Sequence, residues 1–213
     1  MKGLNTFTLK MIAIITMLID HIGHVLFPEV MILRIVGRVS FPIFAYLLAE
    51  GFVYTRDVKK YMLRLGIFAL LSEIPYDLAI MGSVLEFSHQ NVFFTLFIGV
   101  LVLYLMSQVK NIILQYAVVA AGILVCCLLH TDYSNIGILL IFIFYVFRER
   151  KIEKLLIVGL IFIGLTSGLQ LYALLALPLL ALHNRELGPK MKAFFYLFYP
   201  SHLLILYIVH LIV

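Results

Sequence analysis

Span-length apolar segments follow one another along almost the whole chain, and they limit what it can fold into. The first begins after Lys10, and similar segments recur up to the C-terminus of the 213-residue sequence. Hydrophobic residues make up 64% of the chain and charged residues 13%, whereas about 25% of an ordinary soluble domain is charged. Because backbone polar groups in lipid must be satisfied within the protein, such segments form helices. We therefore predict an all-α, polytopic transmembrane helix bundle.

The breaks between the apolar segments define nine predicted spans. Their connections are short and no internal repeat is visible, so we expect residues 1–213 to form a single domain. The sixth to eighth segments are short for a hydrocarbon core of about 30 Å. The predicted spans cover residues 9–27, 31–53, 60–81, 91–108, 110–129, 134–147, 154–166, 168–183 and 193–212.

The distribution of Lys and Arg predicts how these spans are oriented. With the N-terminus in the cytoplasm, the predicted outer loops contain Glu29, Glu86 and Asp132 but no Lys or Arg. Apart from Arg34 and Arg38, the basic residues collect at the cytoplasmic ends of the spans, as the positive-inside rule requires. The net charge of +5 is thus explained by membrane orientation rather than by nucleic-acid binding. We predict a multi-pass protein of the cell membrane.

The stretch MLIDHIGH, residues 17–24, places three ionisable side chains inside the first predicted span. His21 follows Lys10 by eleven residues, which puts it about 16 Å along the helix and near the middle of the membrane. Asp20, His21 and His24 fall on one face of this helix. Ionisable groups at such depth must face the bundle interior or a wet cavity, and they commonly mark a functional site.

The last predicted span carries a further histidine at nearly the same depth. His202 lies about nine residues from the cytoplasmic end of that span. A single intramembrane histidine is often only hydrogen-bonded within the bundle. Several such residues at one depth, from opposite ends of the chain, favour a site instead.

The second and third predicted spans carry two arginines and two carboxylates. By depth, Arg38 falls near Glu73, and Arg34 falls near Asp77. One interpretation is a set of two structural ion pairs that join these helices, because buried charges must be paired. The other places the arginines beside a reacting carbonyl or an acceptor, and the two interpretations can hold together.

A basic cluster lies at the cytoplasmic mouth of the same two spans. It consists of Arg56, Lys59, Lys60 and Arg64. The cluster can be a positive-inside anchor. Placed below a mid-membrane histidine, it could also hold the phosphates of an anionic cofactor.

The runs LKMIAIITMLIDHIGHVLFP and LRIVGRVSFPIFAYLLAEGF resemble the TraX family, which is named for a protein that acetylates the N-terminus of pilin. The resemblance extends along the chain. The sequence is also similar to a reduced transmembrane acyltransferase of the acyltransferase-3 type. In that family a basic residue, ten intervening residues and a His open the first span, and Lys10 and His21 have this spacing. Lys60 and Arg64 match its R-x-x-R-like motif loosely.

The resemblance implies an integral membrane acyltransferase, most simply an acetyltransferase. Acetyl-CoA would be the cytoplasmic co-substrate, no metal would take part, and the acceptor would be an amine or hydroxyl of a peptide, glycan or lipid. Lys10, Lys60 and Arg64, with Arg56 and Lys59 beside them, would bind the donor.

The resemblance also implies roles for the buried polar residues. His21 would be the general base or a transient acyl carrier. Asp20 would fix its tautomer directly or through His24. Arg34 or Arg38 would stabilise the oxyanion. His202 completes the set of candidate catalytic residues, and Glu73 and Asp77 belong either to structural ion pairs or to the acceptor site.

Four other interpretations also account for some of these residues. A proton-coupled transporter also uses intramembrane Asp, Glu and His, but the sequence shows no pair of corresponding halves with broken helices. Haem could be ligated by His21 or His24 together with His202. A metal site of Asp20, His21 and His24 lacks a fourth converging ligand. A structural assembly protein would have little reason to keep polar residues at this depth.

Overall fold

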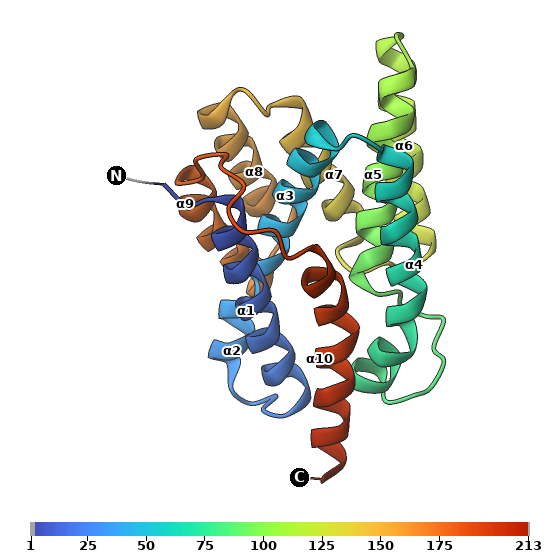
Figure 1. Cartoon of the computed structure of the whole chain (residues 1–213), viewed down its shortest axis with the longest axis vertical. Coiled ribbons are helices and arrows are strands. Elements are labelled where there is room, and N and C mark those ends of the chain that lie inside the picture. The colour runs from blue at the N-terminus through green and yellow to red at the C-terminus, as the bar shows by residue number, and fades with distance from the viewer. Residues whose placement is uncertain (1–2, 213) are drawn as a thin grey trace.

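Helices make up the regular structure of the computed structural model, which describes residues 3–212 (Figure 1). Within this part of the chain there is no β-strand, and only two isolated bridges pair Leu4 with His183 and Gln90 with Thr131. The predicted all-α fold is confirmed. In chain order the elements are α1 (Thr6–Val25), α2 (Met31–Gly37), α3 (Ser40–Tyr54), α4 (Val58–Tyr76), the π-helical turn η1 (Asp77–Met81), α5 (Val92–Gln108), α6 (Ile112–Leu128), α7 (Ser134–Val146), α8 (Lys151–Leu165), the 3₁₀ helix η2 (Gly168–Leu175), α9 (Ala176–Ala181) and α10 (Lys192–Ile212).

Short polar side chains determine where several of the helices begin. Asn5 accepts a hydrogen bond from the backbone N–H of Thr8 at the start of α1, and Asp57 caps α4 in the same way. Asn91 caps α5 and Asn111 caps α6. Each cap satisfies N–H groups that a helix leaves free at its N-terminus. The caps of α1 and α4 lie at the end of the bundle where α3 is followed by α4, which we call the basic end because it carries Arg56.

Three helical stretches are long and apolar enough to cross a membrane. They are Thr6–Val25, Met31–Tyr54 and Lys192–Ile212, and shorter apolar helices occupy much of the rest of the chain. Large aliphatic side chains also point outward from the bundle; on α4, Leu63 and Leu70 are 62% and 70% exposed. Both features are those of a membrane protein. The count of nine spans and their orientation stay predictions.

Two of the predicted spans contain a break in their α-helical geometry. The second is divided into α2 and α3, and Pro42 lies in the first turn of α3. The third continues from α4 into η1, and Pro75 lies in the last turn of α4. Proline lacks the N–H that a continuous helix needs and crowds the preceding turn, which accounts for both breaks. The break in the second span directs α2 toward α1.

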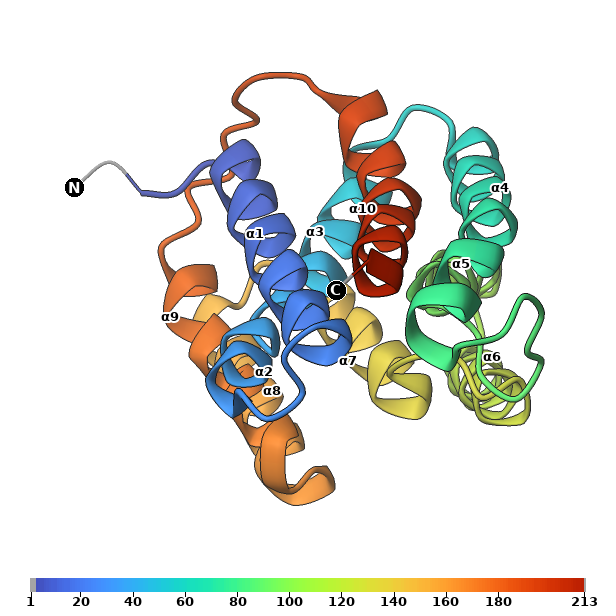
Figure 2. The same cartoon turned by 90° about the horizontal axis from the view of Figure 1, so that it is seen from below.

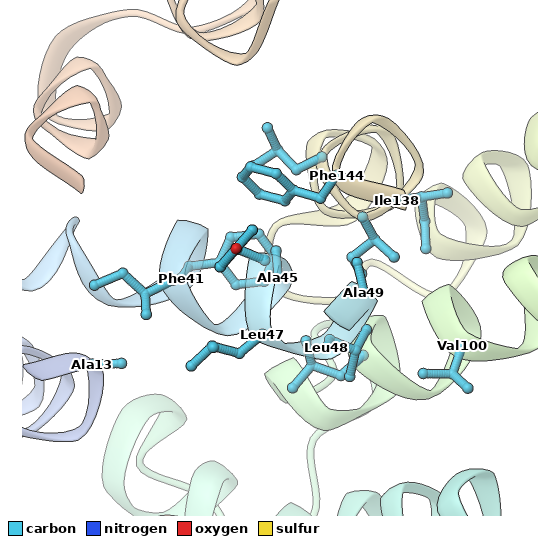
Figure 3. Packing of buried hydrophobic residues seen from close by; sticks show 14 of the residues in the cluster. Ala13, Phe41, Ala45, Leu47, Leu48, Ala49, Val100, Ile138 and Phe144 are labelled. Carbon is cyan, nitrogen blue, oxygen red and sulfur yellow. The ribbon is translucent and has the colours of Figure 1, made fainter. Parts of the chain in front are cut away.

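The first and last helices lie side by side, although the whole chain separates them. α10 packs between α1 and α4, and α3 packs against α1 and α7 (Figure 2). The centre of the hydrophobic core is therefore α3. Its Ala45 and Ala49 face Ile138 and Phe144 of α7 (Figure 3). This packing holds α3 firmly in place and leaves a space between α1, α3, α4 and α10.

Candidate functional site

A cavity of about 890 Å³ occupies the space between these four helices. Arg56 and Lys60 line it at the basic end, His24 and Asp132 line it at the opposite end, and His21 lines it between them. Ligand-binding cavities in proteins are commonly about 300–1,000 Å³. The cavity is therefore large enough for a substantial ligand, and it connects the basic end with the buried polar residues of α1.

His21 of α1 and His202 of α10 contact each other directly. Nδ1 of His21 lies 2.6 Å from Nε2 of His202, and the two rings are stacked. Nδ1 of His202 lies 2.8 Å from the backbone carbonyl oxygen of Phe198. Because a carbonyl oxygen can only accept, Nδ1 of His202 carries the proton and its Nε2 accepts from Nδ1 of His21 when both rings are neutral. This network leaves the Nε2 atom of His21 unprotonated.

The free nitrogen of His21 is available to accept a proton. Among residues 3–212, no hydrogen-bond partner is found for the Nε2 atom of His21, and the side chain lines the cavity. A neutral imidazole with a free lone pair can accept a proton. The expectation that Asp20 fixes the tautomer of His21 is wrong, because the contact with His202 does so.

Asp20 is instead held by the two arginines of the second predicted span. Its Oδ2 accepts from Nη1 of Arg34 at 2.9 Å, and its Oδ1 accepts from Nη2 of Arg38 at 2.5 Å. The side chains of Asp20 and Arg38 are about nine-tenths buried. Two guanidinium groups and one carboxylate leave a net positive charge in the cavity wall, one residue away from His21.

Two glycines allow α2 to lie close enough to α1 for these ion pairs. A Cβ atom on Gly37 would lie 2.1 Å from the Cβ of Asp20, and one on Gly23 would lie 2.6 Å from the Cβ of Leu33. Real side chains do not approach so closely. The small residues at both positions are therefore required by the packing that brings the arginines to Asp20.

The predicted ion pairs of Arg38 with Glu73 and of Arg34 with Asp77 are wrong. Both arginines contact Asp20 because α2 packs on α1, whereas α4 packs on α5 and α10. The carboxylates of α4 and η1 have neutral partners. Glu73 accepts from the side-chain amide of Asn91, and Asp77 accepts from a backbone N–H of the loop that follows η1.

Most of the predicted basic cluster lines the mouth of the cavity. Lys10, Arg56, Lys60 and Arg64 contribute to its lining, whereas Lys59 is exposed and does not. The ammonium of Lys10 lies 5.2 Å above the ring of Phe195. The Nε atom of Arg64 is buried and has no partner among the residues that the structure describes. An anion at the mouth would supply one.

Two further lysines, which were not predicted from the sequence, lie at the mouth of the cavity. Lys190, in the segment before α10, and Lys192, the first residue of α10, line the cavity. In sequence they follow Gly188 and Pro189, which mark a turn between two apolar runs. That turn, next to two basic residues, was a signal that could have assigned them to the mouth.

Asp132 was also missed as a residue of the site. It lies between α6 and α7 and lines the cavity, where burial raises the pKa of its carboxyl to about 6 and the charge of Arg38 opposes that rise. The next residue, Tyr133, has a left-handed backbone with φ 61°, and its ring stacks on Phe41. A non-glycine residue held in this region costs free energy and often marks a functional segment.

Two alternative interpretations can be compared with this geometry. A metal between His21 and His202 would need about 4 Å between the two nitrogens, and they lie 2.6 Å apart. Haem ligation by that pair of atoms is therefore incompatible with the observed contact. Asp20 is bound by its arginines and His24 is exposed, so the acidic and imidazole groups of α1 do not converge on one point.

Comparisons with known proteins add information on relatives. A family model described as TraX protein matches residues 6–210. The probable fimbrial assembly protein FimC, serogroup H1, of Dichelobacter nodosus is 28% identical over 236 residues, which cover 95% of this chain and 94% of that protein. The uncharacterized protein RP591 of Rickettsia prowazekii (strain Madrid E) is 48% identical over 44 residues, or 21% of this chain and 18% of that one. No solved structure matches the chain significantly.

Proposed function

Because the chain belongs to the TraX family, we propose that it is an integral membrane acyltransferase that moves an acyl group from acyl-CoA to an amine or hydroxyl. The observation that carries this proposal is the free Nε2 atom of His21 in the wall of a large cavity. The thioester of acyl-CoA is already activated, so the enzyme needs mainly a base for the acceptor and a positive field for the oxyanion. Both requirements have candidate groups on α1 and α2.

In the proposed reaction the acceptor nitrogen or oxygen adds to the thioester carbonyl carbon while Nε2 of His21 takes its proton. The resulting oxyanion is stabilised by the net positive charge of Arg34 and Arg38 around Asp20. The carbon–sulfur bond then breaks, and the proton passes from His21 to the departing sulfur. The products are an amide or ester and free CoA. In a route with two steps, His21 would itself carry the acyl group.

The mouth of the cavity suits the donor. CoA carries several phosphate charges, and Lys10, Lys60, Arg64 and Lys192 line the mouth. Arginine and lysine bind phosphate through charge-assisted hydrogen bonds, and the buried Nε of Arg64 lacks a partner among the described residues. We place the basic end in the cytoplasm of a cell-membrane protein, so that acyl-CoA enters there and the acceptor enters from the opposite end.

The acceptor is proposed only as a class. One relative is named as a probable fimbrial assembly protein, which makes a surface or pilus subunit one candidate for this chain. A glycan or lipid amine or hydroxyl at the membrane surface would meet the same chemical requirement.

The test compares acetyl-CoA binding and turnover by the purified chain in detergent with those of His21→Ala. We expect turnover to fall at least about 100-fold, because a positioned general base contributes about 10²–10⁴-fold. His89→Ala is the matched control, since His89 is exposed and outside the cavity lining. If the wild type neither binds nor cleaves acetyl-CoA or another acyl-CoA, the proposal fails.

A proton-coupled transporter is the second candidate. One observation favours it, because Oε1 of Glu73 and Oδ1 of Asp77 are buried without a partner among the residues that the structure describes. Such carboxyls can carry protons within a membrane, and a π-helical turn next to them is common at functional sites. Proton uptake by proteoliposomes that Glu73→Gln abolishes, without any acyl-CoA turnover, would favour this function over acyl transfer.

A further inference from the structure

A second cavity, of about 290 Å³, lies at the basic end and shares no lining residue with the larger one. It is formed by α3, the start of α8 and the segment 182–191 between α9 and α10. Its polar lining includes Tyr46, Lys151, Lys154, His183 and Arg185. The proposed acyl transfer uses none of these residues.

Lys154 is the residue of this second cavity that most needs a partner. It is only 4% exposed, and its ammonium lies 4.8 Å above the ring of Tyr46. Its one hydrogen bond is long, 3.4 Å to the carbonyl oxygen of Arg148. Within residues 3–212 no carboxylate forms an ion pair with it. A buried ammonium that forms no direct ion pair is costly, so an anion in the cavity would supply the contact that it lacks.

The charges around the second cavity do not balance. Lys151, Lys154 and Arg185 line it, but Glu149 is the only carboxylate in its lining. Glu149 lies 3.0 Å from Arg185 in an ion pair, and that contact lowers the pKa of its carboxyl. Glu50 is buried in α3 and lies outside the lining; its charge acts on Lys154 and Arg185, but in the described chain it forms no ion pair with them. The cavity thus keeps an excess of positive charge.

The segment that closes the second cavity is held in a defined position. Nδ1 of His183 lies 2.8 Å from the hydroxyl of Tyr46, and its Nε2 lies 3.2 Å from the hydroxyl of Thr6. Arg185 has a left-handed backbone with φ 64°, and its guanidinium donates to the carbonyl oxygen of Arg148 at 2.5 Å. A strained residue persists only where surrounding contacts over-determine it. The cavity is therefore built by specific contacts on two sides.

We propose that the second cavity binds a compact oxyanion, a phosphate or a carboxylate, with Lys154 as its buried charge partner and Lys151 and Arg185 at its rim. Its volume is one third of that of the larger cavity, which suits a small anion rather than a nucleotide-sized donor. The segment that closes it includes Leu187 and is followed by Lys192. Both residues line the mouth of the larger cavity. A bound anion would therefore lie at the base of one wall of that mouth. The proposal is independent of acyl transfer.

The test is equilibrium binding of radiolabelled inorganic phosphate, and separately of radiolabelled acetate, to the full chain in detergent at constant ionic strength. We expect a saturable component of binding that is at least tenfold weaker in Lys154→Met and that persists in Arg64→Gln. Lys110→Met is the matched control, since it removes an exposed lysine outside both cavities, and it should bind like the wild type. The anion that binds more tightly identifies the ligand as a phosphate or a carboxylate.

Two more variants make the result decisive. Arg185→Met changes an exposed residue, so it decides the outcome if Lys154→Met does not fold, and it should weaken binding several-fold. Arg64→Gln removes a cation from the mouth of the larger cavity, where phosphate can also bind, and should leave the component of binding that depends on Lys154 unchanged. The proposal is overturned if neither anion binds saturably, or if Lys154→Met and Arg185→Met bind as tightly as the wild type. Binding that is lost in Arg64→Gln alone also overturns it.

Discussion

The carboxylates of α1 and α4 are satisfied in different ways. On α1, Asp20 lies between the guanidinium groups of Arg34 and Arg38. On α4, Glu73 accepts from the neutral amide of Asn91 and keeps one oxygen buried without a partner in the described chain. The first region holds fixed charges of both signs, whereas no cation among residues 3–212 pairs with the carboxyl of Glu73.

The charges on α1 provide a fixed electric field. The carboxyl on α4 is instead a group that can exchange a proton. A carboxylate between two arginines positions both cations, so it suits a site in which developing negative charge must be stabilised. The carboxyl of Glu73 has an amide partner and no cation to position among the described residues. Removal of the carboxylate charge should therefore lower the free energy of unfolding strongly on α1 and only slightly on α4.

The largest effect is expected for Asp20→Asn. It leaves Arg34 and Arg38 buried without a counter-charge, and removing one partner of a buried pair typically costs about 3–5 kcal/mol of stability. The free energy of unfolding can be measured by circular dichroism during SDS titration in mixed micelles. A loss below about 1 kcal/mol, the usual limit for an exposed pair, would mean that these charges are solvated and that the contrast between α1 and α4 does not exist.

Gly37→Ala should have the next largest effect on stability. The added Cβ would meet Asp20 at 2.1 Å, and forcing an atom into a packed interface typically costs about 1–3 kcal/mol. Gly164→Ala is the matched control, because a Cβ there meets nothing within 4 Å and replacing a helical glycine stabilises by about 0.4–1 kcal/mol. Equal stabilities of the two variants in the SDS titration would show that α2 does not depend on close approach to α1.

His202→Phe should reduce turnover by about 10–100-fold, which corresponds to about 1.4–2.7 kcal/mol. The phenyl ring keeps the stacking but cannot accept the proton of Nδ1 of His21, so the base loses its fixed tautomer. His202 acts through His21 and is a positioning residue, so kcat should fall while donor binding stays unchanged. His202→Gln restores an acceptor and should recover part of the rate. A loss of acetyl-CoA binding in either variant would contradict this role.

The smallest effect is expected for Glu73→Gln. The glutamine oxygen can still accept from Asn91, and no cation loses its partner, so stability should change by less than about 1 kcal/mol. The SDS titration used for Asp20→Asn gives a direct comparison. If Glu73→Gln costs as much as Asp20→Asn, the carboxyl on α4 is held ionised by a charge, and the two regions are alike.

Positions along a helix could be predicted from the sequence, but lateral neighbours could not. The rise per residue put His21 and His202 at one depth, and the structure places them in contact. The same reasoning put Arg38 at the depth of Glu73, yet Arg38 pairs with Asp20. Depth is fixed by the helix itself, whereas the choice of partner depends on which helices pack together. Only tertiary packing decides that.

Residues outside the helices were the hardest to assign. Lys190 and Asp132 come from connecting segments whose path has no periodic signal in the sequence. Their place in the cavity wall depends on special backbone conformations, such as the left-handed Tyr133 next to Asp132. Polar residues within helices could thus be assigned to the site early, and those in loops could not.

The contact between His21 and His202 joins residues separated by 181 positions. A ribosome releases the chain from the N-terminus, so α1 is in the membrane long before α10 exists. The backbone bonds of Leu4 and Thr6 with residues 182 and 186 likewise wait for the last part of the chain. During synthesis His21 therefore has no partner to fix its tautomer, and the mouth of the cavity stays open along one side. An unfinished chain carries His21 but not the contact that orders it, so under the proposed function truncated products would be inactive toward the thioester.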